Sequence, residues 1–146
     1  MLVQPYLNFD GRAEEAIEFY RKAVGAELLM LMRFRECPDP QPGSITPGAE
    51  NKIMHSCLRI GDSQVMLSDG YCQGKTSFQG ISLSLTVANE AEAKSKFGAL
   101  AEGGEVRLPL TRTFFSPSFG MVADRFGVSW MVIVPGEVAT KPVARK

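Results

Sequence analysis

The sequence predicts an α+β fold built from two copies of one strand–helix–strand–strand–strand (βαβββ) module. Short stretches recur in the same order in both halves, and residues 59–63 (RIGDS) are matched by residues 125–129 (RFGVS). Farther upstream, residues 15–20 and 92–97 each begin with Glu-Ala and end on an aromatic residue. Self-similarity in a fixed order is the signature of a duplicated supersecondary unit. We expect the mixed sheets of the two copies to curve around a cleft.

Length and composition are those of one soluble globular domain. The chain has 146 residues, of which 45% are hydrophobic and 22% charged, enough to bury a sizeable core. We expect residues 1–136 to form this domain, with module 1 at residues 1–70 and module 2 at residues 78–136. Residues 137–146 are polar and lack periodicity, which predicts a frayed tail.

Charge and cysteine content indicate which classes of partner and which cellular compartment to expect for the protein. Sixteen basic residues balance sixteen acidic ones, so no broad field steers the chain toward nucleic acid or an anionic membrane. The N-terminal residues lack the features of a signal peptide, and no apolar run approaches the ~20 residues that span a bilayer. Three widely spaced cysteines disfavour a disulfide framework. These features predict a cytoplasmic protein without membrane or nucleic-acid partners.

Module 1 opens with a strand followed by an amphipathic helix. Residues 3–9 alternate, which places Gln4, Tyr6 and Asn8 on one face and apolar residues near the other. Residues 13–24 carry apolar groups at a helical spacing, with acidic residues in the first turn and basic residues in the last. A glycine follows directly, and glycine ends helices because it readily adopts positive φ.

The rest of module 1 is predicted to be a strand, a long loop and a hairpin. Residues 27–34 are rich in Leu and Met and favour a strand. Residues 36–50 hold four prolines, which excludes regular structure, and loops of this length are usually functional or disordered. Two further strands are expected over residues 52–60 and 63–68, joined by a Gly-Asp turn. A polar connector over residues 71–79 leads to module 2.

Module 2 repeats this order. Residues 81–87 alternate strictly, and we expect their aliphatic odd-numbered face to be buried. Asn89, with Glu92 three residues on, resembles a capping box at the start of a helix that runs to about residue 101. The remaining strands are expected at residues 105–110, 119–124 and 127–134, the last two paired across an Arg-Phe turn.

In this order and spacing, several stretches resemble the vicinal oxygen chelate superfamily, which includes glyoxalases, bleomycin-resistance proteins and extradiol dioxygenases. Within it, the chain is most similar to the PhnB-like branch, often labelled 3-demethylubiquinone methyltransferase-like. The matching stretches are PYLNFDG (5–11), AIEFY (16–20), MHSCLRIG (54–61), VMLSD (65–69), FG (119–120) and DRFGV (124–128), followed by Trp130. The resemblance implies the glyoxalase/bleomycin-resistance/dioxygenase fold. It also implies a homodimer, since superfamily members generally pair modules within or between chains.

The resemblance further implies where a metal ion would bind. Metal-dependent members carry His, Glu or Gln at symmetric points on the first and last strands of each module. These points fall here at Gln4, at Val65 or Met66, at Gly80 or Ser82, and at Met131. Zinc, iron and nickel need three or four His or carboxylate groups at such a site. We therefore expect no metal and no cofactor.

His55 is the only histidine in the sequence and the candidate catalytic residue. A histidine at this point also belongs to the PhnB-like resemblance, and the alternative is a half-buried structural residue. Strand alternation places it on one face with Ile53 and Cys57. Activation of Cys57 by His55 is disfavoured, because residues i and i+2 on a strand stand roughly 6.5–7 Å apart. We expect Cys57 to be a small buried thiol.

Aromatic residues gather in module 2. Most aromatic side chains belong to the core, but those in or beside the loop over residues 113–119 are placed to line the mouth of a pocket. The predicted ligand-binding set is Gln4, Tyr6, Asn8, His55, Phe115, Phe119 and Trp130.

A methyltransferase activity finds no support in the residues. A doubly wound S-adenosylmethionine domain needs a Gly-rich turn after its first strand and an alternation of strands and helices. Here the only early glycines are Gly11 and Gly25, and the strands come in hairpins.

Three functions compete. The first is a metal-free protein that binds a small apolar or aromatic molecule between the modules. The second is an enzyme in which His55, with Gln4, Tyr6 or Asn8, performs acid–base chemistry on a small oxygenated substrate. The third is a metalloenzyme of the glyoxalase or dioxygenase type. We favour them in that order.

Overall fold

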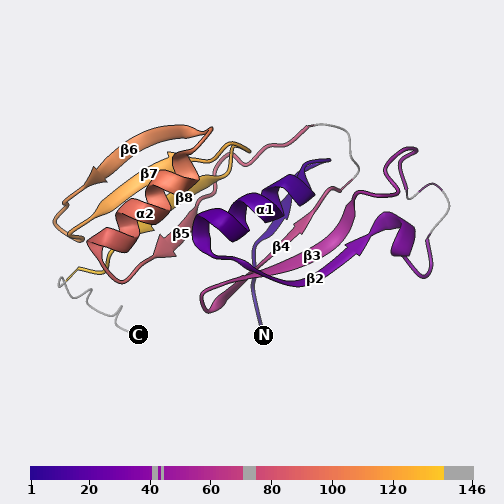
Figure 1. Ribbon diagram of the computed structural model, residues 1–146, viewed down its shortest axis with the longest axis horizontal. Coiled ribbons are helices and arrows are strands. Elements are labelled where there is room, and N and C mark those ends of the chain that lie inside the picture. Colours follow the sequence, from indigo (N-terminus) through magenta and orange to yellow (C-terminus); the bar gives the residue numbers. More distant parts are fainter. Residues whose placement is uncertain (41–42, 44, 71–74, 137–146) are drawn as a thin grey trace, which may run out of the picture. The chain divides into compact units, whose positions relative to one another are not determined.

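The computed structural model describes residues 1–40, 43, 45–70 and 75–136. The chain divides into two compact units, Met1–Ser77 and Phe78–Lys146. Each unit holds one α-helix and one four-stranded mixed sheet (Figure 1). The predicted α+β class with two βαβββ modules is therefore confirmed. The predicted tail and part of the predicted connector lie outside the described residues.

The first unit contains β1 (Tyr6–Asn8), α1 (Ala13–Val24), β2 (Glu27–Arg33), the 3₁₀-helix η1 (Phe34–Glu36), β3 (Ile53–Ile60) and β4 (Ser63–Ser68). The strand order is β1-β4-β3-β2, in which β1 runs parallel to β4 and the other neighbours are antiparallel. Ile60 pairs with Ser63, so the predicted two-residue Gly-Asp turn closes the β3–β4 hairpin.

Helix α1 covers one face of this sheet and forms the core of the unit with it (Figure 1). The predicted apolar stripe of the helix is buried, Ile17 and Tyr20 included, and so are Leu58 and Leu67 of the sheet. Full burial of one such side chain stabilises the fold by about 1.5–3 kcal/mol. The helix thereby determines which face of the sheet lies inside, and it leaves the other face uncovered within the unit.

A β-bulge in β3 changes one predicted face. The register between β2 and β3 steps past Met54, which is the extra residue. A bulge adds one residue to a strand and shifts the alternation of the side chains beyond it. Ile53 is consequently buried instead of lying beside His55 and Cys57, which are both half-buried. The prediction that Ile53 shares the face of His55 was wrong.

The N-terminus of α1 is capped by a residue that is distant in sequence. Asp69, just after β4, is 1% exposed. One carboxylate oxygen accepts hydrogen bonds from the backbone N–H groups of Gly11 (2.7 Å) and Ala13 (2.8 Å), and the other accepts from Ile53 (2.8 Å). Arg12, at the N-cap position itself, makes no side-chain cap bond. A buried anion thus satisfies donors at the positive end of the helix and ties α1 to the start of β3.

The second unit contains β5 (Leu83–Thr86), α2 (Glu90–Ala101), β6 (Glu105–Thr111), β7 (Phe119–Ala123) and β8 (Ser129–Ile133). The strand order is β5-β8-β7-β6, with β5 parallel to β8 and the other neighbours antiparallel. Helix α2 packs against β6, β7 and β8. Phe97 and Leu100 of the helix and Val132 of the sheet are buried in this core.

Helix α2 begins as the sequence predicts. The side chain of Asn89 accepts a hydrogen bond from the backbone N–H of Glu92 (2.8 Å). The carboxylate of Glu92 accepts in return from the backbone N–H of Ala88 (3.1 Å), one residue before the cap. All of these contacts lie within one turn of the helix start, so the local sequence contains the whole cap.

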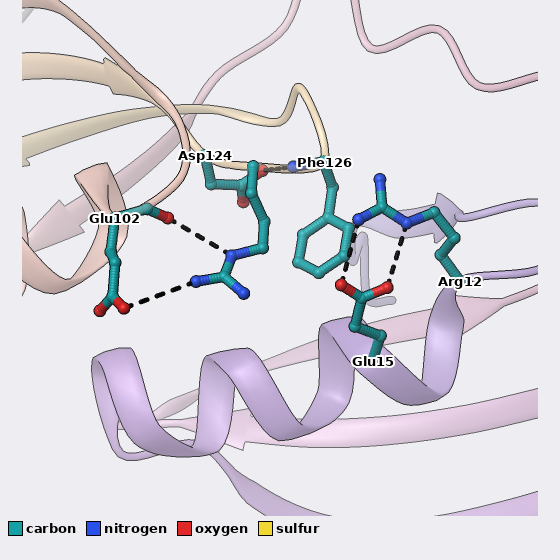
Figure 2. Close-up of polar contacts among 6 residues, drawn as sticks. Arg12, Glu15, Glu102, Asp124 and Phe126 are labelled. Carbon is teal, nitrogen blue, oxygen red and sulfur yellow. Dashed lines mark hydrogen bonds and ion pairs between the residues drawn. The ribbon is translucent and has the colours of Figure 1, made fainter.

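The β7–β8 hairpin is closed by a longer loop than predicted. One carboxylate oxygen of the buried Asp124 accepts from the backbone N–H groups of Phe126 (2.9 Å) and Val128 (3.1 Å), and Figure 2 shows the contact with Phe126. Residues 124–128 therefore form a loop folded around a carboxylate. The backbone N–H of Gly127 also donates to the carbonyl of Asp124 (2.9 Å), so Arg125 and Phe126 form the predicted turn, but β7 ends at Ala123 and β8 begins only at Ser129. Arg125 donates to the backbone carbonyl of Glu102 at 3.3 Å, which fastens the loop to the end of α2.

The first strand of each unit is shorter than predicted. β1 begins only at Tyr6, because Pro5 has no N–H to donate, although its carbonyl still accepts from Met66 of β4 (3.0 Å). In the second unit, Ile81 is 59% exposed. β5 is an edge strand beyond the three strands on which α2 packs, so its aliphatic face is buried only at Val87. Neither helix in the described ranges is long and apolar enough to cross a bilayer.

Candidate functional site

The face of the first sheet that α1 does not cover carries several of the predicted site residues. We call it the open face and define it by Tyr6, Met30, His55, Cys57 and Met66. The register places Tyr6 beside Met66 and Met66 beside Cys57. Cys57 in turn lies beside Met30, so one row of side chains crosses all four strands. Tyr6 is 50% and Met30 40% exposed, so this row forms an accessible, sulfur-rich surface.

Tyr6 and His55 supply the polar point of the open face. The Tyr6 hydroxyl and Nδ1 of His55 lie 2.8 Å apart, and the two ring centroids are 5.6 Å apart. Which atom donates depends on the tautomer of the imidazole. Among the described residues, Nε2 of His55 has no hydrogen-bond partner. This nitrogen is therefore available to a ligand, a proton or a metal ion.

Cys57 makes its polar contact away from His55. Its Sγ lies 3.5 Å from the side-chain oxygen of Gln64 on β4, which is a weak interaction because thiols are poor donors. The predicted separation of Cys57 from His55 is consistent with this arrangement. The predicted burial was wrong, since Cys57 is half-buried as a free thiol.

Gln4 and Asn8 hold less central positions. Gln4 precedes β1 and is half-buried. The side-chain oxygen of Asn8 accepts from the backbone N–H of Asp10 at 3.1 Å. A Cβ added to Gly70 would come within 2.7 Å of Cγ of Asn8, so this amide packs closely on the glycine. Asn8 thus stabilises the turn after β1.

The predicted aromatic residues occupy two different environments in the second unit. Phe115 and Phe119 are half-buried, and their ring centroids are 5.1 Å apart. Phe114 continues this cluster into solvent and is 85% exposed. Trp130 is 3% exposed, and its indole N–H donates to Asp124 (2.9 Å). Trp130 therefore contributes to the core, and we leave it out of the candidate site.

The positions that the resemblance implied for metal ligands lie on or beside strands of both units. Val65 is buried whereas Met66 lies on the open face, and Gly80 and Ser82 precede β5. Met131 is half-buried. Within the part of the chain that the structure describes, no three His, Cys, Asp or Glu side chains are grouped to hold a metal ion.

One ion pair in the first unit shifts two pKa values. Arg33, the last residue of β2, contacts Glu14 in the first turn of α1 at 2.6 Å. The hydrogen bond from Arg33 lowers the pKa of the Glu14 carboxyl and raises the pKa of the guanidinium. Because the two charges satisfy each other across the end of a strand and the start of a helix, we assign the pair a structural role.

Asp69 and Asp124 are two buried carboxylates whose roles were not predicted from the sequence. Asp69 directly follows β4 and Asp124 directly follows β7, and each precedes a turn. An aspartate in this position is a local sequence signal for a carboxylate that bonds to the backbone of a turn. The oxygens of both accept from backbone N–H groups or an indole. Their role is structural, and they organise the elements on which the open face depends.

The comparisons with known proteins agree with the fold. The family model described as 3-demethylubiquinone-9 3-methyltransferase matches residues 2–133. The protein YjdN from Escherichia coli is 36% identical, over 97% of this chain and 100% of its own length. The crystal structure of PA1353 from Pseudomonas aeruginosa is 40% identical, covers 92% of this chain and 98% of that chain, and has a TM-score of 0.77. A PhnB protein from Bacillus cereus is 29% identical, covers 92% and 99%, and has a TM-score of 0.73.

The chain belongs to the 3-demethylubiquinone-9 3-methyltransferase family, to which the PhnB protein from Bacillus cereus is also assigned by its description. The predicted resemblance is thereby confirmed. The family description names a methyltransferase, but the described residues form hairpins in two mixed sheets. A doubly wound sheet, on which the predicted test for an S-adenosylmethionine domain depended, is absent from the described ranges.

Proposed function

We propose that this PhnB-like protein binds a small aromatic or apolar molecule on the open face of its first sheet, without a divalent metal ion. The observation that carries the proposal is the row of Tyr6, Met66, Cys57 and Met30 beside the hydrogen-bonded imidazole of His55. Polarisable sulfur atoms and an aromatic ring suit a flat apolar ligand. A small number of polar groups in an apolar surface is typical of small-molecule sites.

The test is a binding titration with a panel of aromatic probes of the size of naphthol, followed by the intrinsic fluorescence of the protein. Tyr6→Ala should weaken binding by about tenfold, since an aromatic contact of about 1.4 kcal/mol is lost. Ser84→Ala is the matched control, because Ser84 stands opposite Met131 as Tyr6 stands opposite Met66. Equal affinities of Tyr6→Ala and the parent protein would contradict the proposal.

A second candidate function is acid–base catalysis by His55. The 2.8 Å contact between the Tyr6 hydroxyl and Nδ1 favours it, because a hydrogen bond on one nitrogen orients the other for proton transfer. His55→Asn separates the two functions. If this variant still binds the aromatic probe, the result supports the first function. If the variant completely loses turnover of an oxygenated substrate, the result supports the second.

We also propose that the protein is a cytoplasmic homodimer. Apolar side chains that remain exposed in the single chain support the dimer, among them Ile81, Val106 and Phe114. Two free thiols in the described residues support a reducing compartment. Sedimentation equilibrium should give twice the chain mass of 16.0 kDa. A monomer at micromolar concentration would contradict the dimer.

Elemental analysis tests the remaining part of the proposal. Protein purified without a chelator should contain well under one equivalent of zinc, iron, nickel or manganese. One tightly held divalent ion per chain would favour a glyoxalase-type or dioxygenase-type metalloenzyme instead.

A further inference from the structure

Two short motifs on adjacent strands bring soft donor atoms together on the open face. β2 carries Met30-Leu31-Met32 and β3 carries His55-Ser56-Cys57. The antiparallel register sets Met30 opposite Cys57 and Met32 opposite His55. On the other side of β3, Cys57 also stands opposite Met66 of β4. One thiol therefore has a thioether on each flank and an imidazole two residues away.

The spacing of these groups suits a single small ion. Directly opposed residues of antiparallel strands have Cβ atoms about 4.5–5.5 Å apart. Methionine has three flexible side-chain torsions, so its sulfur can move several ångströms toward a common point. Cys57 and Met66 are half-buried and Met30 is exposed, so an ion can enter from solvent. The row lies on the uncovered side of the sheet and needs no opening of the core.

The donor chemistry selects the metal. Thiolate and thioether ligands prefer copper(I), whereas carboxylates and water suit hard divalent ions. No Asp or Glu belongs to the five open-face residues, and no three His, Cys, Asp or Glu side chains cluster among the described residues. A thioether-rich set of this kind is unsuited to zinc, which takes thiolate, imidazole and carboxylate ligands.

We propose that Met30, Cys57 and Met66, with His55, bind one copper(I) ion or a chemically similar soft monovalent cation. On binding, the thiol of Cys57 releases its proton to solvent and forms the metal–sulfur bond as a thiolate. The copper stays in the +1 state, so no oxidant or reductant takes part. The inference goes beyond the proposed function and does not depend on it.

Tyr6 acts here as a positioning residue. Its hydroxyl occupies Nδ1 of His55 at 2.8 Å and leaves Nε2 as the nitrogen available to the ion. Ligand histidines are commonly oriented by a hydrogen bond at their second nitrogen, and loss of such a bond typically weakens metal binding 10–100-fold. The contact fixes the direction of the imidazole, and with Nδ1–H donating to the Tyr6 oxygen, Nε2 holds the lone pair that binds the ion.

The second unit provides an internal control. Met121 and Met131 stand opposite each other on β7 and β8, as Cys57 and Met66 do on β3 and β4. The facing row continues to Leu108 and Ser84. It thus presents a thioether pair without a thiol or an imidazole.

The experiment is an anaerobic competition for copper(I) between the reduced full-length protein and bicinchoninate, whose copper(I) complex is coloured. The parent protein should withdraw one copper(I) per chain. Cys57→Ser and the double variant Met30→Leu/Met66→Leu should each weaken the affinity by at least tenfold, and Tyr6→Phe by about tenfold. Leu preserves the volume of Met, and far-UV circular dichroism of each variant checks that it is folded. X-ray absorption of the loaded protein should show a sulfur shell with one imidazole nitrogen.

Two control variants make the outcome decisive. Cys37→Ser removes another free thiol, and Met121→Leu/Met131→Leu removes the control pair. Both variants should withdraw copper(I) from bicinchoninate as strongly as the parent protein does. The proposal is overturned if the parent protein binds no copper(I) or if Cys57→Ser binds it as tightly as the parent protein. It is also overturned if either control variant loses as much copper(I) affinity as Cys57→Ser is expected to lose. Zinc binding with the same dependence on Cys57 and Met66 would overturn the assignment to a soft cation. None of these outcomes affects the aromatic-probe titration, because that titration contains no metal.

Discussion

The two units share their element order but hold their elements together with different polar contacts. α1 and α2 each span 12 residues, and β2 and β6 each span seven. Yet α1 is capped by Asp69 from beyond β4, whereas α2 is capped by Asn89 directly before it. The comparison teaches that the repeated apolar pattern determines the architecture, while each copy stabilises that architecture in its own way.

The uncovered sheet faces differ in the same manner. The first presents Tyr6, His55 and Cys57 along with methionines, and the corresponding row of the second presents Ser84 and two methionines. Of these two rows, the first therefore carries both the imidazole and the thiol, whereas the second carries thioethers without either. The following substitutions compare equivalent positions of the two units.

The largest effect is expected at the buried carboxylates Asp69 and Asp124. Asp69→Ala leaves three N–H donors without an acceptor, two of them fully buried and on distant segments, and each buried donor costs about 1–3 kcal/mol. The free energy of unfolding should fall by about 3–5 kcal/mol. Asp124→Ala should cost about 2–3 kcal/mol, because its donors, the N–H groups of Phe126 and Val128 and the indole of Trp130, all lie within six residues of it in the chain and can adjust by a local rearrangement. Urea unfolding followed by circular dichroism measures both. An equal or larger loss for Asp124→Ala would break the distinction between long-range and local anchoring.

The second-largest effect is expected at the junction between the helix and the following strand, where Ala26 of the first unit corresponds to Gly104 of the second. A Cβ at position 104 would overlap the carbonyl oxygen of Ala123 and lie 2.8 Å from the carbonyl carbon of Asp124. Gly104→Ala should therefore destabilise the protein by about 2–3 kcal/mol through overpacking. Ala26→Gly removes one buried methyl group and should cost about 1 kcal/mol. Thermal unfolding of the two variants gives the comparison, and a neutral Gly104→Ala would show that this junction is looser than described.

The helix caps should differ by a smaller amount. Asn89→Ala removes the cap of α2 and should cost about 1 kcal/mol. Arg12→Ala, at the equivalent position of α1, should change the stability by less than about 0.5 kcal/mol, because Asp69 supplies that cap. Arg12 forms an exposed pair with Glu15, which Figure 2 shows, and such pairs contribute little. Chemical denaturation gives the free energy of unfolding of both variants. A larger loss for Arg12→Ala than for Asn89→Ala would contradict this expectation.

The smallest effect concerns Glu14, whose equivalent in the second unit is Ala91. The pKa of Glu14 is lowered in the folded protein by Arg33, so its contribution to stability is present above the unfolded pKa of about 4.3 and is lost as the pH falls through the folded value. Glu14→Gln should cost about 0.2–1 kcal/mol at pH 7, because the side chain is 56% exposed. The difference from the parent protein should disappear toward pH 3. Unfolding measured at both pH values tests this, and a difference that grows in acid would contradict the sign.

Much of the scaffold could be predicted from local patterns. The apolar spacing of residues 13–24 reproduces α1, and Asn89 with Glu92 marks the start of α2. Prediction failed where the outcome depends on neighbours in space. Val3 and Ile81 fit the predicted alternation, but they lie before the starts of β1 and β5 and both are exposed. Trp130 belongs to the predicted ligand-binding set, yet it is buried and its indole N–H donates to Asp124.

The sequence by itself determined the order of elements, the lengths of both helices and the cap of α2. These features depend on contacts within four or five residues, which periodicity and side-chain type report directly. Tertiary structure alone decided the cap of α1, the bulge at Met54 and the alignment of Met30, Cys57 and Met66 in one row. Each of these needs partners from different strands, and their register is set by burial of the opposite face, which no local pattern contains.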